Sequence, residues 1–132
     1  MNEPLTTKTP GPVAPQSVRD QLERMLSSGT FAGAERVQSL LRYLVEETLH
    51  GRGDRVRAKS IGLDLYNYDA EDIEKRATVV RVDAGRLRKK IADYYDTEGQ
   101  RDDIIIGLPK GGYVPVFEAK SLVETPSVEQ VH

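Results

Sequence analysis

The sequence contains no cysteine and no tryptophan, and it has only two phenylalanines and two histidines. Without cysteine, neither a disulfide framework nor a thiolate zinc site can form. The two histidines, His50 and His132, are far apart in the sequence, and the acidic cluster between residues 69 and 74 lacks the spacing of a calcium-binding EF-hand loop. We therefore predict no metal and no cofactor, and a core made mainly of aliphatic side chains.

Long apolar runs are also missing, since none approaches the roughly 20 residues that a membrane-spanning helix needs. Residues 1–16 carry a single cation, Lys8, and no apolar segment of the kind found in secretory signals. No serine, acid or histidine stands in a recognisable nucleophile or general-base motif. We therefore expect a cytoplasmic protein that has no contact with a membrane and is not an enzyme.

Charge is unevenly distributed along the chain. The net charge is −2, but the segment from Lys75 to Lys90 contains seven cations and one anion, Asp83. A local positive patch on an otherwise acidic body favours a directed contact with phosphate groups over general binding to polyanions.

The chain divides into one domain and two tails. Residues 1–16 are rich in proline and threonine and residues 119–132 lack periodicity, so both are predicted to be disordered, leaving a domain at 17–118. Ser17 is a candidate N-cap for a first helix, and a second helix is predicted from Ala32 to His50, ending before Gly51. A short helix is expected at Ala58–Tyr66.

The basic segment predicts a long helix over residues 78–95, with Thr78 as its N-cap. Its apolar residues recur at spacings of four and three and form one inward row: Val80, Ala84, Leu87, Ile91 and Tyr94. Nearly opposite this row lie Val82, Gly85, Arg86 and Lys89. A glycine in mid-helix costs about 1 kcal/mol relative to alanine. Close approach of the helix to a large partner would explain its presence.

The last part of the domain changes period. Residues 103–117 contain two β-branched runs on either side of "PKGG", which predicts a hairpin with Lys110 at or near its tip. Pro115 has no N–H group, so the returning strand is expected at a sheet edge.

Two segments, "TVVRVDAGRLRKKI" and "IIIGLPKGGYVPVF", resemble the recognition helix and wing of OmpR-type winged helix-turn-helix domains. Residues 17–118 are more closely similar to the N-terminal DNA-binding-like domain of some bacterial tetratricopeptide and adenylate-cyclase-type proteins. The similar segments include "LLRYLVEETLHGRGDRVRAKSIGLDLY". The expected fold is therefore mainly α with a small β-hairpin wing. The chain differs from OmpR-type domains in one respect: those domains begin with a small antiparallel sheet, whereas residues 17–50 are predicted to be helical.

The resemblance implies a bacterial transcriptional regulator that prefers certain double-stranded DNA sequences. It would insert helix 78–95 in the major groove and use hairpin 103–117 as a wing. We expect a nucleoid-associated homodimer joined through the Ala32–His50 helix or the first helix. RNA polymerase or another regulator is a further candidate partner. The predicted DNA-binding residues are Arg76, Thr78, Arg81, Val82, Asp83, Gly85, Arg86, Arg88, Lys89, Lys90, Lys110, Gly111 and Gly112.

Several alternatives stay open at this stage. The same cations would suit a protein-interaction module that recognises an acidic partner, or a nucleoid binder of low specificity. For Asp83, an ion pair with Arg86 or Lys90 in the same helix is favoured over an acceptor role towards a cytosine amino group.

Overall fold

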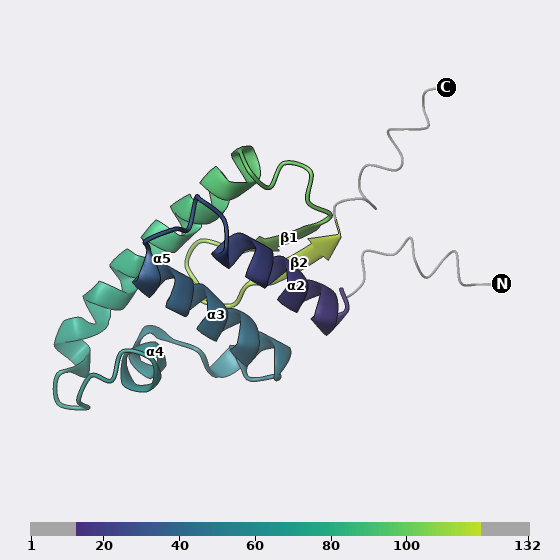
Figure 1. The fold of residues 1–132 in the computed structure, drawn as a ribbon. Coiled ribbons are helices and arrows are strands. Elements are labelled where there is room, and N and C mark those ends of the chain that lie inside the picture. Colours follow the sequence, from purple (N-terminus) through teal and green to yellow (C-terminus); the bar gives the residue numbers. More distant parts are fainter. Residues whose placement is uncertain (1–12, 120–132) are drawn as a thin grey trace, which may run out of the picture.

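A computed structural model describes residues 13–119 of the chain. The described part is mainly helical and ends in a two-stranded antiparallel sheet (Figure 1). The elements in chain order are α2 (Pro15–Leu26), α3 (Glu35–Leu49), a 3-10 turn (Gly53–Arg55), α4 (Ala58–Asp64), α5 (Ile73–Asp96), β1 (Ile104–Gly107) and β2 (Val116–Ala119). The predicted tails fall mostly outside the described residues, although Pro15 and Gln16 already belong to α2 and Ala119 belongs to β2.

Helix α5 runs along one side of the molecule, with α2 and α3 beside it and α4 next to its N-terminal end (Figure 1). The apolar faces of these helices meet in one core. The predicted inward row of α5, from Val80 to Tyr94, is buried throughout. The core also includes Val18, Leu22, Met25, Phe31, Leu40, Leu41, Leu44, Val45, Ile61 and Ile106. The sequence prediction of an aliphatic core built on helical periodicity is therefore confirmed.

Two predicted N-caps are wrong. Helix α2 begins at Pro15 with Ala14 at the cap position, so Ser17 lies inside its first turn. Proline suits the first helical position because its fixed φ matches the helix and its missing N–H would have had no partner there. Helix α5 begins at Ile73, five residues before Thr78, which lies within the helix and is exposed.

The early start of α5 follows from its packing on α4. Ile73 and Ala77 extend the buried row of α5 by two turns. A Cβ on Gly62 of α4 would lie 2.3 Å from Cδ1 of Ile73, so the glycine lets the two helices approach closely. The connection between α4 and α5 therefore ends at Asp72, the residue before the first turn of α5.

The loops before and after α3 set the other boundaries. Helix α3 begins at Glu35, later than the predicted Ala32, and Gly33 just before it has a φ of +78°. Its predicted end is confirmed: Gly51 has a φ of +80°, the left-handed conformation that glycine tolerates after a helix.

The loop between α2 and α3 is held by a residue that follows α5. The carboxylate of Glu98 accepts hydrogen bonds from the backbone N–H groups of Gly29 (2.9 Å) and Thr30 (2.7 Å).

The C-terminal hairpin pairs Ile104 with Ala119 and Gly107 with Val116. Pro115 directly precedes β2, where its missing N–H interrupts no ladder hydrogen bond. A long connection of residues 108–115 joins the strands, and Lys110 lies in its turn, as predicted. Within residues 13–119, none of the helices combines the length and the apolar character that crossing a bilayer requires.

Candidate functional site

The solvent-facing side of α5 brings together four of the predicted residues, Val82, Gly85, Arg86 and Lys89, which we call the front of α5. Val82 is 47% exposed, and the side chains of Arg86 and Lys89 are 68% and 79% exposed. A Cβ built on Gly85 would meet no described atom within 4 Å. No neighbour in the described part of the chain therefore requires a glycine at this position.

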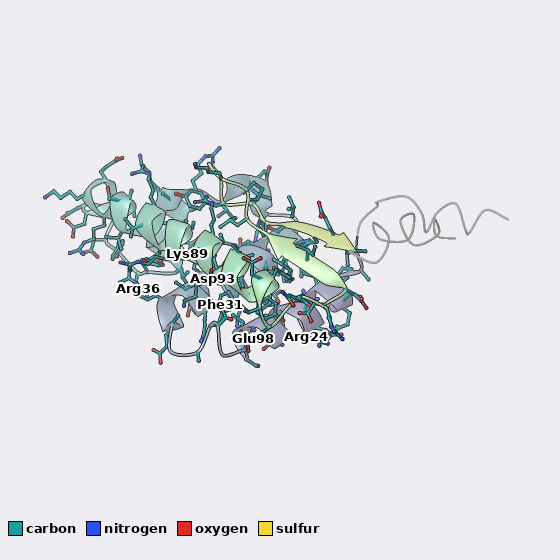
Figure 2. All side chains as sticks on the ribbon, turned by 90° about the horizontal axis from the view of Figure 1, so that it is seen from above. Arg24, Phe31, Arg36, Lys89, Asp93 and Glu98 are labelled. Carbon is teal, nitrogen blue, oxygen red and sulfur yellow. The ribbon has the colours of Figure 1, made fainter. Side chains whose placement is uncertain are left out.

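A hollow of about 590 Å³ lies between α5 and the beginning of α3. Its cations are Arg36, Arg86, Lys89 and Lys90, and its carboxylates are Glu35, Asp83 and Asp93. Figure 2 shows Arg36, Lys89 and Asp93 on this side of the molecule. The ammonium of Lys89 is 3.7 Å from a carboxylate oxygen of Asp93 on the next turn, an exposed pair that contributes little to stability.

A second hollow of about 440 Å³ lies between α5, the start of α4 and the hairpin connection. Ala58, Arg81, Arg88, Gly111 and Tyr113 line it. Arg81 and Lys90 thus belong to opposite flanks, as the helical spacing predicts. Helix α5 forms a ridge between these two hollows, the first lined by four cations and three carboxylates and the second by two arginines.

Asp83 is the predicted site residue whose environment differs most from the expectation. Its side chain is only 3% exposed, and one carboxylate oxygen accepts hydrogen bonds from Arg36 Nη2 (2.7 Å) and the Tyr66 hydroxyl (2.6 Å). The other carboxylate oxygen is 3.6 Å from Arg86 Nη1. The predicted pair with Arg86 is present, but a buried carboxylate with these partners cannot reach a DNA base, so Asp83 does not belong to the contact surface.

The cluster around Asp83 joins three segments of the chain. Arg36 from α3 stacks over the ring of Tyr66, with its guanidinium carbon 5.1 Å from the ring centre. Burial, and then the hydrogen bond to Asp83, raise the pKa of Tyr66, so its hydroxyl keeps its proton and continues to donate. This cluster fixes α5 against α3 directly beneath the front of α5.

Arg88 also makes hydrogen bonds within the chain. Its Nε donates to the carbonyl of Pro109 (3.2 Å) and its Nη2 donates to the carbonyl of Gly112 (2.7 Å). Two of the five N–H groups of Arg88 therefore point at the hairpin connection, so its predicted contact with DNA would use the other three.

The remaining predicted residues lie in the hairpin turn, beside the middle of α5, and near the start of this helix. Lys110 and Gly111 are exposed in the hairpin turn, and Gly111 has a φ of +87°. A Cβ on either Gly111 or Gly112 would meet no described atom within 4 Å. Arg76 lies over the ring of Tyr68 near the start of α5, with 5.0 Å from the guanidinium carbon to the ring centre.

Sequence reasoning missed Arg36 and Tyr66. Arg36 is 47 residues before Asp83 and Tyr66 is 17 residues before it, so no helical spacing links them. Among residues 13–119, no group of three histidines, cysteines or acids is arranged to hold a metal ion.

Comparison with known proteins adds no assignment. No protein-family model, curated protein or solved structure matches this chain. The function must therefore be inferred from the geometry of α5 and its surroundings.

Proposed function

We propose that the protein binds double-stranded DNA with a sequence preference and regulates transcription. In this proposal α4 and α5 form a helix-turn-helix, the hairpin of β1 and β2 is the wing, and the front of α5 enters the major groove. The observation that carries the proposal is the ridge itself: an exposed, cationic helix face that has no side chain at Gly85 and is flanked by Arg81 on one side and Lys90 on the other.

The dimensions of a helix support this arrangement. An α-helix with its side chains is about 10–12 Å across, and the major groove of B-DNA is about 12 Å wide. The two phosphate strands that border the groove would then lie over the two hollows, near Arg81 on one flank and Lys90 on the other. The bare backbone at Gly85 would allow the helix axis to approach the base edges.

Each residue of the front has a chemical role in this proposal. The Val82 side chain, 47% exposed, suits apolar contact with a thymine methyl group. Arg86 suits a bidentate contact with guanine, and Lys89 suits a guanine edge or a phosphate. Arg86 gains a defined starting position from its proximity to the buried carboxylate of Asp83.

Helices α2 and α3, which were expected to join a homodimer, expose no large hydrophobic side chain. The exposed large hydrophobic residues of the described chain are Leu63, Val82, Val114 and Val116, and none of them lies on these two helices. The exposed sides of α2 and α3 are instead linked by the ion pairs Arg19–Glu46 and Arg42–Glu23. We therefore propose DNA binding by single domains, with any pairing of copies set by adjacent sites on DNA.

The proposal is tested by selecting duplexes from a random pool and measuring their affinity by fluorescence anisotropy. Arg86→Ala should weaken binding by about 1–3 kcal/mol and relax the preference at one base pair. Arg24→Ala is the matched control, because Arg24 is an exposed arginine of α2 at a distance from Arg36 and Lys89 (Figure 2).

The outcomes separate the competing functions. A sharp selected motif that Arg86→Ala degrades and Arg24→Ala leaves intact supports the proposal. Uniform affinity for all duplexes would indicate a nucleoid binder of low specificity. Absence of duplex binding at low salt would refute DNA binding and favour recognition of an acidic protein partner.

A further inference from the structure

Arg88 holds the hairpin turn at two points that bracket its tip. Its two hydrogen bonds end on the carbonyls of Pro109 and Gly112, and Lys110 and Gly111 lie between these acceptors. The guanidinium therefore spans the turn from α5, and the bond to Gly112 is partly buried. Both hydrogen bonds run from a side chain of α5 to the backbone of the connection at residues 108–115.

The geometry points to Arg88 as a positioning residue that fixes Lys110 as a DNA contact. This inference rests on the proposed function, in which the hairpin is a wing. Lys110 itself is exposed, and the two glycines that follow it leave open space around the turn. The turn would sample many conformations if its carbonyls were not tied to α5, and Lys110 would lose entropy on binding.

Arginine is required for this role because its planar fork reaches two acceptors at once. Lysine keeps the positive charge, but its compact ammonium group on a flexible stem lacks the rigid fork that holds the two carbonyls in a fixed geometry. Arg88→Lys therefore removes the anchor while preserving the electrostatic attraction to DNA. Arg24→Lys is a matched control, since Arg24 is an exposed arginine of α2 outside the proposed contact surface.

A double-mutant cycle separates positioning from direct contact. In the wild-type background, Lys110→Ala should lower the slope of log affinity against log salt by about 0.9, the value for one lost phosphate contact. In the Arg88→Lys background, Lys110→Ala should leave the slope nearly unchanged, because the contact is already lost. In the Arg24→Lys background, the full effect of Lys110→Ala should remain.

Additive effects of Arg88→Lys and Lys110→Ala would overturn the inference, because they would show that the two side chains act independently. A second measurement does not depend on DNA. Backbone amide relaxation by NMR should show greater motion of residues 109–112 in Arg88→Lys than in the wild type, with α5 unchanged. Equal motion in both proteins would refute the anchor even if DNA binding held, whereas a rigid wild-type turn in a protein that binds no duplex would refute only the proposed function.

Discussion

Substitutions at Gly85 should affect the stability of the protein and its affinity for DNA in different ways. Gly85→Ala adds one methyl group at an exposed helical position where no described atom lies within 4 Å. The substitution therefore introduces no clash within the chain and improves helix propensity by about 1 kcal/mol. For a domain of about 100 residues, this gain should raise Tm by roughly 4–8 °C. Differential scanning calorimetry measures this shift directly.

A larger side chain at residue 85 should weaken DNA binding. If the helix backbone at residue 85 lies close to the floor of the groove, a larger side chain there must push the helix outward. We expect Gly85→Leu to lose about 1–3 kcal/mol of binding free energy, the usual cost of overpacking a close contact. This corresponds to a factor of about 5 to 150 in Kd. Fluorescence anisotropy with the selected duplex measures this loss.

Ser39→Leu provides the control for added bulk, because Ser39 is exposed on α3 and not on the front of α5. It should leave the affinity for DNA close to that of the wild type. If Gly85→Leu binds DNA as tightly as the wild type does, the front of α5 does not enter a groove. A Gly85→Ala protein that is less stable than the wild type would instead contradict the open space around residue 85.

Three further predictions concern stability. Asp83→Ala should lower the free energy of unfolding by about 1–3 kcal/mol in urea titrations, because it leaves the partly buried hydroxyl of Tyr66 without its acceptor; an unchanged midpoint would contradict the role given to this cluster. Leu87→Ala, at a fully buried position of α5, should cost about 2–5 kcal/mol in the same assay, and a smaller loss would mean that the core rearranges to fill the space. Hydrogen bonds from the Thr30 side chain and then from the backbone of Gly29 and Thr30 lower the pKa of Glu98 below 4.5, so its contribution to stability is present above that pH and is lost as the pH falls through the lowered value; Glu98→Gln should be less stable at neutral pH and less sensitive to acid, and parallel acid-unfolding curves would refute this.

The sequence predicted the helical elements and the inward row of α5 well. The row from Val80 to Tyr94 follows from a period of 3.6 residues, and all its members are buried. The hairpin followed from its β-branched runs and its glycines. The start of α5 could not be read in the same way, because Ile73 belongs to the helix through its packing on Gly62 of α4.

The same distinction applies to the residues of the candidate site. Val82, Gly85, Arg86 and Lys89 share one exposed face because their spacing in a helix requires it, and the sequence alone determined this grouping. The tertiary structure decided the roles of Asp83 and Arg88, whose partners lie on α3, on the segment after α4 and on the hairpin connection. Local periodicity reports only on neighbours three or four residues away, whereas a hydrogen bond between distant segments depends on how the helices pack.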